Sequence, residues 1–213
     1  ELIHAFISRD RIINSSNEID KNFIDKEIGK EKNDQVVVMG LGMFIYRKGA
    51  DIFMKTAERL KRKGIDCHFV WIGSKPFKEP FMSDFNRYKD HFTFIGEKQN
   101  PFPYLNSADV FALPSREDPF PLVVLESMAL GKPSVIFGDA GGIKKAVKDS
   151  GIILKDMTVD AFSDAIEKIV IDNELRKDLS SKAIDNQSMY DSTVVLPKID
   201  SLVTNLLKEE DGK

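Results

Sequence analysis

The sequence predicts an α/β fold, with a parallel sheet of about six strands flanked by helices and a helical carboxy-terminal end. Short apolar runs rich in Val, Ile and Phe alternate with segments of helical periodicity about 10 to 15 residues long. Strands buried on both faces of a parallel sheet are expected to form such continuous apolar runs. We expect strands at residues 35–39, 67–72, 91–95, 109–113, 134–137 and 151–154.

Helical patterns connect and follow these strands. Ile52, Phe53, Ala57 and Leu60 fall at helical spacing between the first two strands, and Gly64 follows as a stop. After the last strand we expect only helices, the last of which should pack against a part of the protein outside this sequence. These helices are predicted at residues 160–171, 173–187 and 196–208.

The segment 14–32 is polar and charged, and it is predicted to be an edge or linker element. It opens with the turn signal Asn14-Ser15-Ser16-Asn17 and continues into a helical pattern at 19–28. The chain begins with an apolar segment and without Met, so we expect further sequence upstream.

Composition and charge exclude several classes of protein. The 213 residues, 42% of them hydrophobic, are enough for one well-buried domain, expected at 1–213. The net charge of −3 gives no general attraction for nucleic acid or anionic lipid. The single cysteine, Cys67, suits a reducing compartment, and no apolar run approaches the roughly 18 to 20 residues that span a bilayer. We therefore expect a soluble, cytoplasmic protein.

The first candidate site follows the first strand. Gly40 and Gly42 let the backbone turn closely, and Arg47 and Lys48 stand just before a helix, where a phosphate is favoured. A dinucleotide fingerprint needs a third glycine where Ile45 stands, so the nicotinamide interpretation is rejected. Solvated cations in a loop are an equally good interpretation of this segment alone.

The second candidate site follows the fourth strand. A short helix is expected to begin near Pro121, to end at Gly131, and to present an apolar face formed by Leu122, Leu125 and Ala129.

Two carboxylates accompany this helix. Asp118 precedes it and Glu126 lies just over one turn within it, so both can accept hydrogen bonds from sugar or ribose hydroxyls. An N-cap and a solvated helix residue are the structural alternatives. A third segment, Gly138-Asp139-Ala140-Gly141-Gly142, is either a loop that approaches a ligand with bare backbone or a tight turn.

Taken together, residues 36–187 resemble the carboxy-terminal domain of glycosyltransferase family four, the glycosyl transferases group 1. The resemblance depends on the paired-acid motif, an acid, seven residues and a Glu, which runs from Asp118 to Glu126. Arg-Lys-Gly before a helix, Phe-Ile-Gly closing the third strand, Ala-Asp-Val opening the fourth and the Gly-Gly loop occur in the family's order. The resemblance implies a Rossmann-like sheet that forms one half of a GT-B fold.

The family's roles are carried over to the matching positions. Asp118 would contact the donor sugar, Glu126 the ribose, and Arg47 and Lys48 the diphosphate, with Asp118, Lys48 and Arg47 as the catalytic set. The remaining donor-binding residues implied are Gly96 and Glu97, beside the base, and Phe120, Pro121, Leu122 and Val123, through their backbone.

Three positions depart from the family pattern. The first acid is usually Glu, and Glu117 lies beside Asp118, so either side chain could meet the sugar. A glycine common in the motif is Pro121 here, which has no N–H to donate. An Arg found six residues before the Lys in many members is Gly42 here, and Arg47 is expected to compensate.

The resemblance implies a retaining hexosyltransferase of surface polysaccharide synthesis. It would take a UDP- or GDP-sugar without a cofactor, and bind a glycan or lipid-linked acceptor through an amino-terminal domain absent from this sequence. The sequence has no Asp-x-Asp motif and no His cluster with ligand spacing, so we expect no metal requirement. The isolated chain should then bind nucleotide without transferring sugar, and the full-length protein would work at the inner face of the membrane. His4, His68 and His91 are isolated in sequence and expected to be structural.

Three other functions stay open at this point. A nucleotide-sugar epimerase of GT-B shape would use the same donor without an acceptor, and a non-catalytic module would only bind a nucleotide or glycan. A flavodoxin-like signalling domain would need a phosphorylatable Asp cluster after the first strand, where the sequence has Met39-Gly40.

Overall fold

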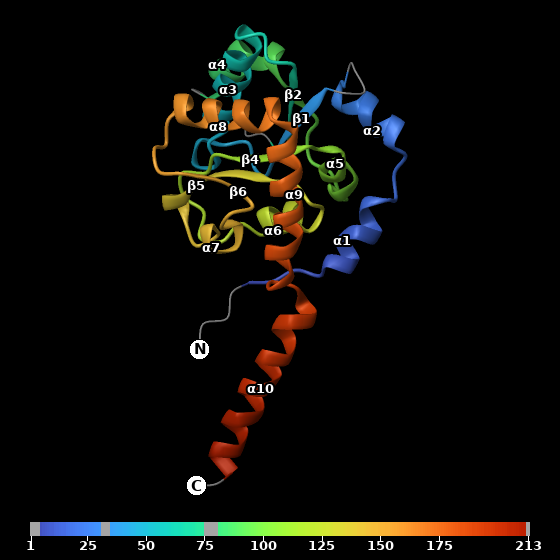
Figure 1. Ribbon diagram of the computed structural model, residues 1–213, viewed down its shortest axis with the longest axis vertical. Helices are drawn as coiled ribbons and strands as arrows, with labels where there is room; N and C mark the ends of the chain where they lie inside the picture. Colours follow the sequence, from blue (N-terminus) through green and yellow to red (C-terminus); the bar gives the residue numbers. More distant parts are fainter. Residues whose placement is uncertain (1–4, 31–34, 75–80, 212–213) are drawn as a thin grey trace.

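A computed structural model describes residues 5–30, 35–74 and 81–211. Its centre is a six-stranded sheet with the order β3-β2-β1-β4-β5-β6, in which every neighbouring pair is parallel (Figure 1). The strands are β1 (Val36–Leu41), β2 (Cys67–Ile72), β3 (Thr93–Phe94), β4 (Val110–Leu113), β5 (Ser134–Phe137) and β6 (Gly151–Leu154). The predicted fold class is confirmed.

The strand order places a switch point between β1 and β4. The chain runs outward from β1 through β2 to β3, then crosses back to β4 and runs outward to β6 on the other side. Asp109 sets the register, because its N–H donates to the Val37 oxygen at 2.9 Å and its carboxylate accepts from the Val37 N–H at 2.8 Å. Loops after β1 and β4 leave the sheet in opposite directions, which opens a crevice at the carboxyl ends of these strands.

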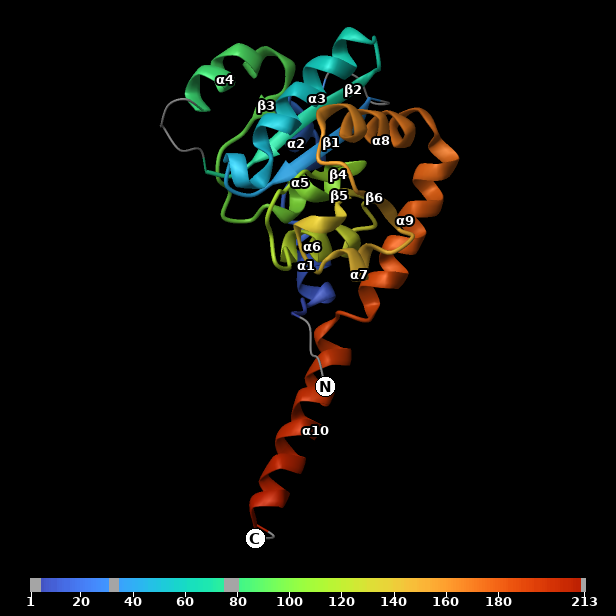
Figure 2. The same ribbon diagram turned by 90° about the vertical axis from the view of Figure 1, so that its left-hand side faces the viewer.

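Helices cover both faces of the sheet (Figure 2). On one face, α3 (Ala50–Arg62) packs against α8 (Val159–Ile171) and α4 (Phe81–Tyr88). The other face is covered by α1 (Arg9–Ser16), α2 (Lys21–Ile28), α5 (Phe102–Ser107) and α6 (Leu122–Ala129). The remaining helices are α7 (Lys144–Val147), α9 (Asn173–Ser188), which packs along α6, and α10 (Ser192–Asp211).

Most predicted elements are present with small changes in their bounds. All six strands are present, three of them with the predicted bounds. The crossover helix and the helices predicted at 160–171 and 173–187 are confirmed, and the helix predicted at 196–208 is part of the longer α10. The third strand is shorter than predicted because residues Lys89–His91 form a 3-10 turn, η2. Helices α1, α4, α5 and α7 were not expected from the periodicity.

The helix predicted at 19–28 is confirmed as α2, whereas the turn predicted to open at Asn14 and the alternative of a linker are wrong for the described residues. Asn14 to Ser16 form the last turn of α1, where the Ser16 hydroxyl donates to the Ile13 oxygen at 2.8 Å. Ile24 and Ile28 of α2 are buried in the core, so both helices belong to the domain.

The last helix, α10, extends away from the body of the domain (Figure 1). It exposes Leu196, Val203, Leu206 and Leu207. At its start the Ser192 N–H donates to the Ile7 oxygen at 2.7 Å, which joins the start of α10 to the segment before α1. Within the described residues, none of the helices combines the length and apolar character needed to cross a membrane.

Candidate functional site

Lys48 and Asp118 meet at the carboxyl ends of β1 and β4. Lys48 ends a short 3-10 helix, η1 (Tyr46–Lys48), and Asp118 lies in the loop after β4. The Lys48 ammonium forms an ion pair with the Asp118 carboxylate, and only 16% and 10% of these side chains are exposed. The Ser115 hydroxyl lies 3.5 Å from the same carboxylate oxygen. A cation and an acid predicted from separate motifs therefore form one partly buried pair.

Two glycines allow the loops to approach this closely. Gly49 has φ +73°, and a Cβ added there would lie 1.9 Å from the Pro114 oxygen. A Cβ added to Gly141 would lie 1.9 Å from the Asp118 oxygen, and the Asp118 N–H donates to Ala140 at 2.8 Å. The glycine-rich loop after β5 thus lies against the loop that contains Asp118.

Of the two neighbouring acids, only Asp118 is directed at the lysine. Asp118 is buried, whereas Glu117 is exposed to solvent. The Arg47 guanidinium donates to the main-chain oxygen of Glu117 at 2.9 Å, which places Arg47 beside the loop after β4 that contains Asp118. An added Cβ at Gly42 would meet nothing within 4 Å, so the position of the family's usual Arg is open space.

Glu126 is half-buried on the second turn of α6, and within the described residues it contacts neither Lys48 nor Asp118 through a hydrogen bond or ion pair. Burial raises the pKa of its carboxyl above the ordinary value. A buried carboxylate without a partner is costly, so this group is suited to accept hydrogen bonds from a ligand.

The predicted apolar face of α6 needs one correction. Leu125 and Ala129 are buried as expected, but 41% of Leu122 is exposed. Leu122 begins the helix at the crevice, where the chain still turns out of the loop, so its side chain is not covered by the core. Pro121 is the N-cap and has no N–H, so the first amides available to a ligand are those of Leu122 and Val123.

The titration of Glu126 provides a test. A carboxyl whose pKa is higher in the folded chain destabilises the fold as pH rises from the unfolded pKa through the folded pKa. Glu126→Gln removes the ionisable group and with it this loss of stability. We therefore expect the variant to have a higher Tm than wild type at neutral pH, and an equal Tm below about pH 4, where the carboxyl is protonated in both states. Glu117→Gln, at an exposed site, is the matched control and should show no such difference. Parallel Tm curves for wild type and Glu126→Gln would contradict the assignment of Glu126 as a buried, unpaired acid.

The loop after β3 reaches the same end of the sheet. Gly96 has φ +73°, and its oxygen accepts from the Gly73 N–H at 2.9 Å, which places it beside the end of β2. Lys98, two residues later, forms an ion pair with Glu27 of α2, and the Tyr104 hydroxyl donates to the same carboxylate at 2.6 Å. Against the opposing effect of burial, these two bonds lower the pKa of Glu27.

Phe120 and Glu97 complete the predicted set. Phe120 is half-buried and its ring packs against Tyr190, with 5.9 Å between centroids. Glu97 follows Gly96 in the loop after β3. Neither residue is joined to the Lys48 and Asp118 pair by a hydrogen bond or ion pair in the described part of the chain.

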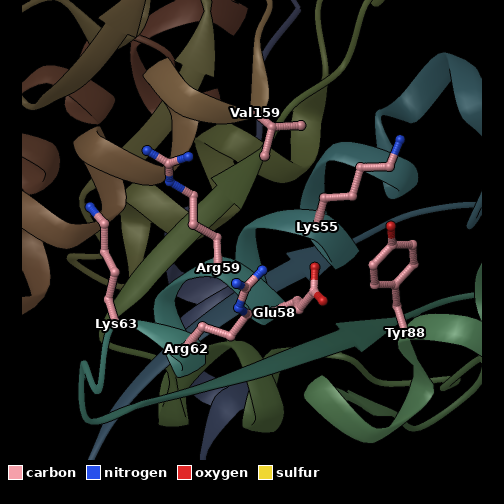
Figure 3. Close-up of a pocket in the computed structure, with 7 residues that line it drawn as sticks. All are labelled: Lys55, Glu58, Arg59, Arg62, Lys63, Tyr88 and Val159. Atoms are coloured by element: carbon pink, nitrogen blue, oxygen red, sulfur yellow. The ribbon is translucent and has the colours of Figure 1, made fainter.

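A cavity of about 670 Å³ lies elsewhere, between α3, α4 and the start of α8. Figure 3 shows its lining side chains, Lys55, Glu58, Arg59, Arg62, Lys63, Tyr88 and Val159. Arg59 pairs with Asp160, and Lys63 pairs with Glu167. Acidic residues of α8 therefore pair with two of the four cations that line this cavity. The cavity is not at the carboxyl ends of the strands, where an open parallel sheet binds its ligand, so we do not assign the donor to it.

His68, His91 and Cys67 lie at or before the amino-terminal ends of β2 and β3, away from the crevice. His68 Nε2 lies 2.6 Å from the Ile28 oxygen and 3.1 Å from the Thr93 hydroxyl, contacts of a structural residue. Burial raises the pKa of Cys67 to about 12, which makes it an unreactive thiol. In residues 5–30, 35–74 and 81–211, no three His, Cys, Asp or Glu side chains gather as metal ligands. His4 lies outside the described residues.

Sequence reasoning missed Arg116, Asp51 and Tyr46. The Arg116 guanidinium pairs with the Asp51 carboxylate and lies over the Tyr46 ring. The signal for Asp51 was weak: it is an acid in the first turn of a helix, where acids are common.

Comparisons with known proteins show the family of this chain. The family model described as "Glycosyl transferases group 1" matches residues 20–186. Among curated relatives, the alpha-D-kanosaminyltransferase of Streptomyces kanamyceticus is 26% identical over 86% of this chain and 49% of its own length. The capsular polysaccharide biosynthesis glycosyltransferase CapM of Staphylococcus aureus is 25% identical over 92% of this chain and 53% of its own length. The chain spans about half the length of the curated relatives it matches.

A solved structure shows the same fold. The Anabaena protein HepE, crystallised in complex with UDP, superposes with a TM-score of 0.80 at 18% identity. The match covers 96% of this chain and 57% of the HepE chain.

Proposed function

The chain belongs to the glycosyl transferases group 1 family, and on that premise we propose that it is the donor-binding half of a retaining glycosyltransferase. Its donor would be a UDP- or GDP-sugar. The observation that supports this most directly is the partly buried Lys48 and Asp118 pair at the carboxyl ends of β1 and β4, where an open parallel sheet binds its ligand.

In this proposal Lys48 binds the diphosphate. Phosphate oxygens compete with the Asp118 carboxylate for the ammonium, and Arg47 adds a second positive charge at the edge of the crevice. The Leu122 and Val123 amides at the start of α6 contribute dipoles of the same sign. As the bond to the sugar breaks, charge develops on the departing diphosphate, and these fixed groups stabilise it.

We assign the sugar to Asp118 rather than to Glu117. Asp118 faces the lysine from a buried position, whereas Glu117 is exposed and its main-chain oxygen holds Arg47. Once the diphosphate has taken the lysine, the Asp118 carboxylate is free to accept hydrogen bonds from sugar hydroxyls.

Glu126 would bind the ribose, because its carboxylate is half-buried and unpaired among the described residues. Gly96 and Glu97 would lie beside the base, with Phe120 and the backbone of Pro121 to Val123 along the sugar and phosphate. No metal or cofactor is proposed, since the charge on the diphosphate is met by Lys48, Arg47 and helix dipoles.

The rest of the enzyme would form the opposite wall of the crevice and bind the acceptor. Met43, Tyr46 and Leu122 are exposed apolar side chains that follow β1 and β4 at this end of the sheet, and α10 exposes a further apolar surface. We propose a glycan or lipid-linked acceptor in surface polysaccharide synthesis, with peripheral association of the full-length protein at the inner face of the membrane. The domain 1–213 alone should bind nucleotide and transfer no sugar.

Titration with nucleoside diphosphates tests the proposal. We expect either UDP or GDP to raise the Tm of the chain at about 1 mM, and EDTA to leave the shift unchanged. The matching nucleoside should produce a smaller shift, because it lacks the diphosphate that Lys48 would bind. Absence of any shift with all common nucleoside diphosphates would contradict donor binding.

A further inference from the structure

Arg116 joins the two loops that contain Lys48 and Asp118. Its guanidinium donates to both carboxylate oxygens of Asp51, at 2.7 and 2.8 Å, and to the main-chain oxygen of Tyr46, at 2.6 Å. The same guanidinium lies over the Tyr46 ring, 3.7 Å from its centroid. A bidentate carboxylate contact combined with stacking fixes both the position and the plane of an arginine.

Main-chain contacts continue this connection up to the paired residues. The Arg116 N–H donates to the Arg47 oxygen at 2.9 Å, and the Arg47 guanidinium donates to the Glu117 oxygen at 2.9 Å. Each loop therefore donates a hydrogen bond to the other. Lys48 directly follows Arg47, and Asp118 directly follows Glu117, so these bonds restrain the separation of the pair.

Asp51 anchors this arrangement on a rigid element. It lies in the first turn of α3, a helix of 13 residues, and only 9% of its side chain is exposed. A carboxylate buried to this extent needs a partner, and Arg116 is the partner that the structure provides. Hydrogen bonding to Asp51 raises the pKa of Arg116, so the arginine stays charged.

From these contacts we infer that Arg116 is a positioning residue, which sets the spacing of Lys48 and Asp118 through the backbone of their loops. Its side chain makes no hydrogen bond to either member of the pair in the described part of the chain. The inference rests on the proposed function, in which the distance between Lys48 and Asp118 matters because both bind the sugar diphosphate.

The first experiment measures nucleotide affinity. The chain has one tryptophan, Trp71, whose indole N–H donates to the Gly42 oxygen at 2.8 Å, so its fluorescence reports on the loop after β1.

UDP and GDP are titrated into wild type and into a variant combining Arg116→Met with Asp51→Asn, which leaves no unpaired buried charge. We expect about tenfold weaker binding of whichever nucleotide binds wild type, because small displacements of a positioned group are costly. Arg176→Met is the matched control. Arg176 lies on α9, and its guanidinium also donates to main-chain oxygens, those of Ile169 and Val170. This variant should bind the nucleotide as tightly as wild type does.

A second experiment needs no ligand. A double-mutant cycle gives the coupling free energy between Lys48→Met and Asp118→Asn from their free energies of urea unfolding. The cycle is measured in wild type and again in the Arg116→Lys background. Arg116→Lys keeps the charge and loses the bidentate contact. A positioning role predicts that the coupling is lost in this background, whereas a purely structural role lowers overall stability and leaves the coupling unchanged.

The outcomes separate the inference from the proposed function. If wild type binds neither UDP nor GDP, the proposed function fails, whatever the coupling shows. If wild type binds and the double variant binds equally well, or if the coupling survives in the Arg116→Lys background, the positioning role is wrong.

Discussion

Replacing Lys48 by methionine should lower sugar transfer by the full-length enzyme about 10²- to 10³-fold, the effect of removing one preorganised group that stabilises developing charge. Lys48 is the cation that lies within the crevice, with 16% of its side chain exposed, so water cannot easily replace it. The measurement is kcat/KM for transfer from the donor identified by nucleotide titration.

Two control variants isolate the role of Lys48. Lys145→Met removes an exposed lysine of α7 and should leave transfer unchanged. Loss of Lys48 also leaves the Asp118 carboxylate buried without its partner, which destabilises the fold. Combining Lys48→Met with Asp118→Asn should restore stability without restoring transfer. Recovery of transfer in this double variant would show that the pair is structural.

The acids provide the complementary comparison. Asp118→Asn should impair transfer strongly and Glu117→Gln only weakly, because Asp118 is buried beside the lysine and Glu117 is exposed. A larger loss of activity in Glu117→Gln than in Asp118→Asn would mean that Glu117, and not Asp118, contacts the sugar.

Substitution of Gly49 by alanine should destabilise the fold much more than the same substitution at a glycine of equal φ that has open space around it. At φ +73° an alanine is strained by about 1 to 2 kcal/mol, and its Cβ would lie 1.9 Å from the Pro114 oxygen. Main chain cannot yield as a flexible side chain does, so the loop after β4 must move. We expect a total loss above about 3 kcal/mol, measured by urea unfolding.

Gly64 is the matched control for this substitution. Its φ of +74° is nearly identical, but an added Cβ meets nothing within 4 Å. Gly64→Ala should therefore cost only the backbone strain, about 1 to 2 kcal/mol. Equal losses at the two positions would mean that the close approach of Gly49 to Pro114 does not occur in solution.

The elements of this protein were predictable because their patterns are local. The runs at 67–72, 134–137 and 151–154 match their strands at both ends, and the apolar spacing from Ile52 to Leu60 predicted α3. Helices α1 and α5 were missed because they have few residues and weak periodicity. The burial of Ser16, Ile24 and Ile28 could not be predicted, because it depends on the packing of α1 and α2 against α5.

The sequence by itself determined the parallel α/β fold, the family and the list of candidate residues, because hydrophobic periodicity and motif spacing depend on neighbours along the chain. Only the tertiary structure decided which candidates meet. Lys48 and Asp118 are 70 residues apart, and Arg116 and Asp51 are 65 apart. These contacts exist because β1 and β4 lie side by side in the sheet, an order that no local pattern specifies. The conformation of the loop after β4, which is held by hydrogen bonds from the Asp118 N–H to Ala140 and from Arg47 to the Glu117 oxygen, directs Asp118 and not Glu117 at the lysine.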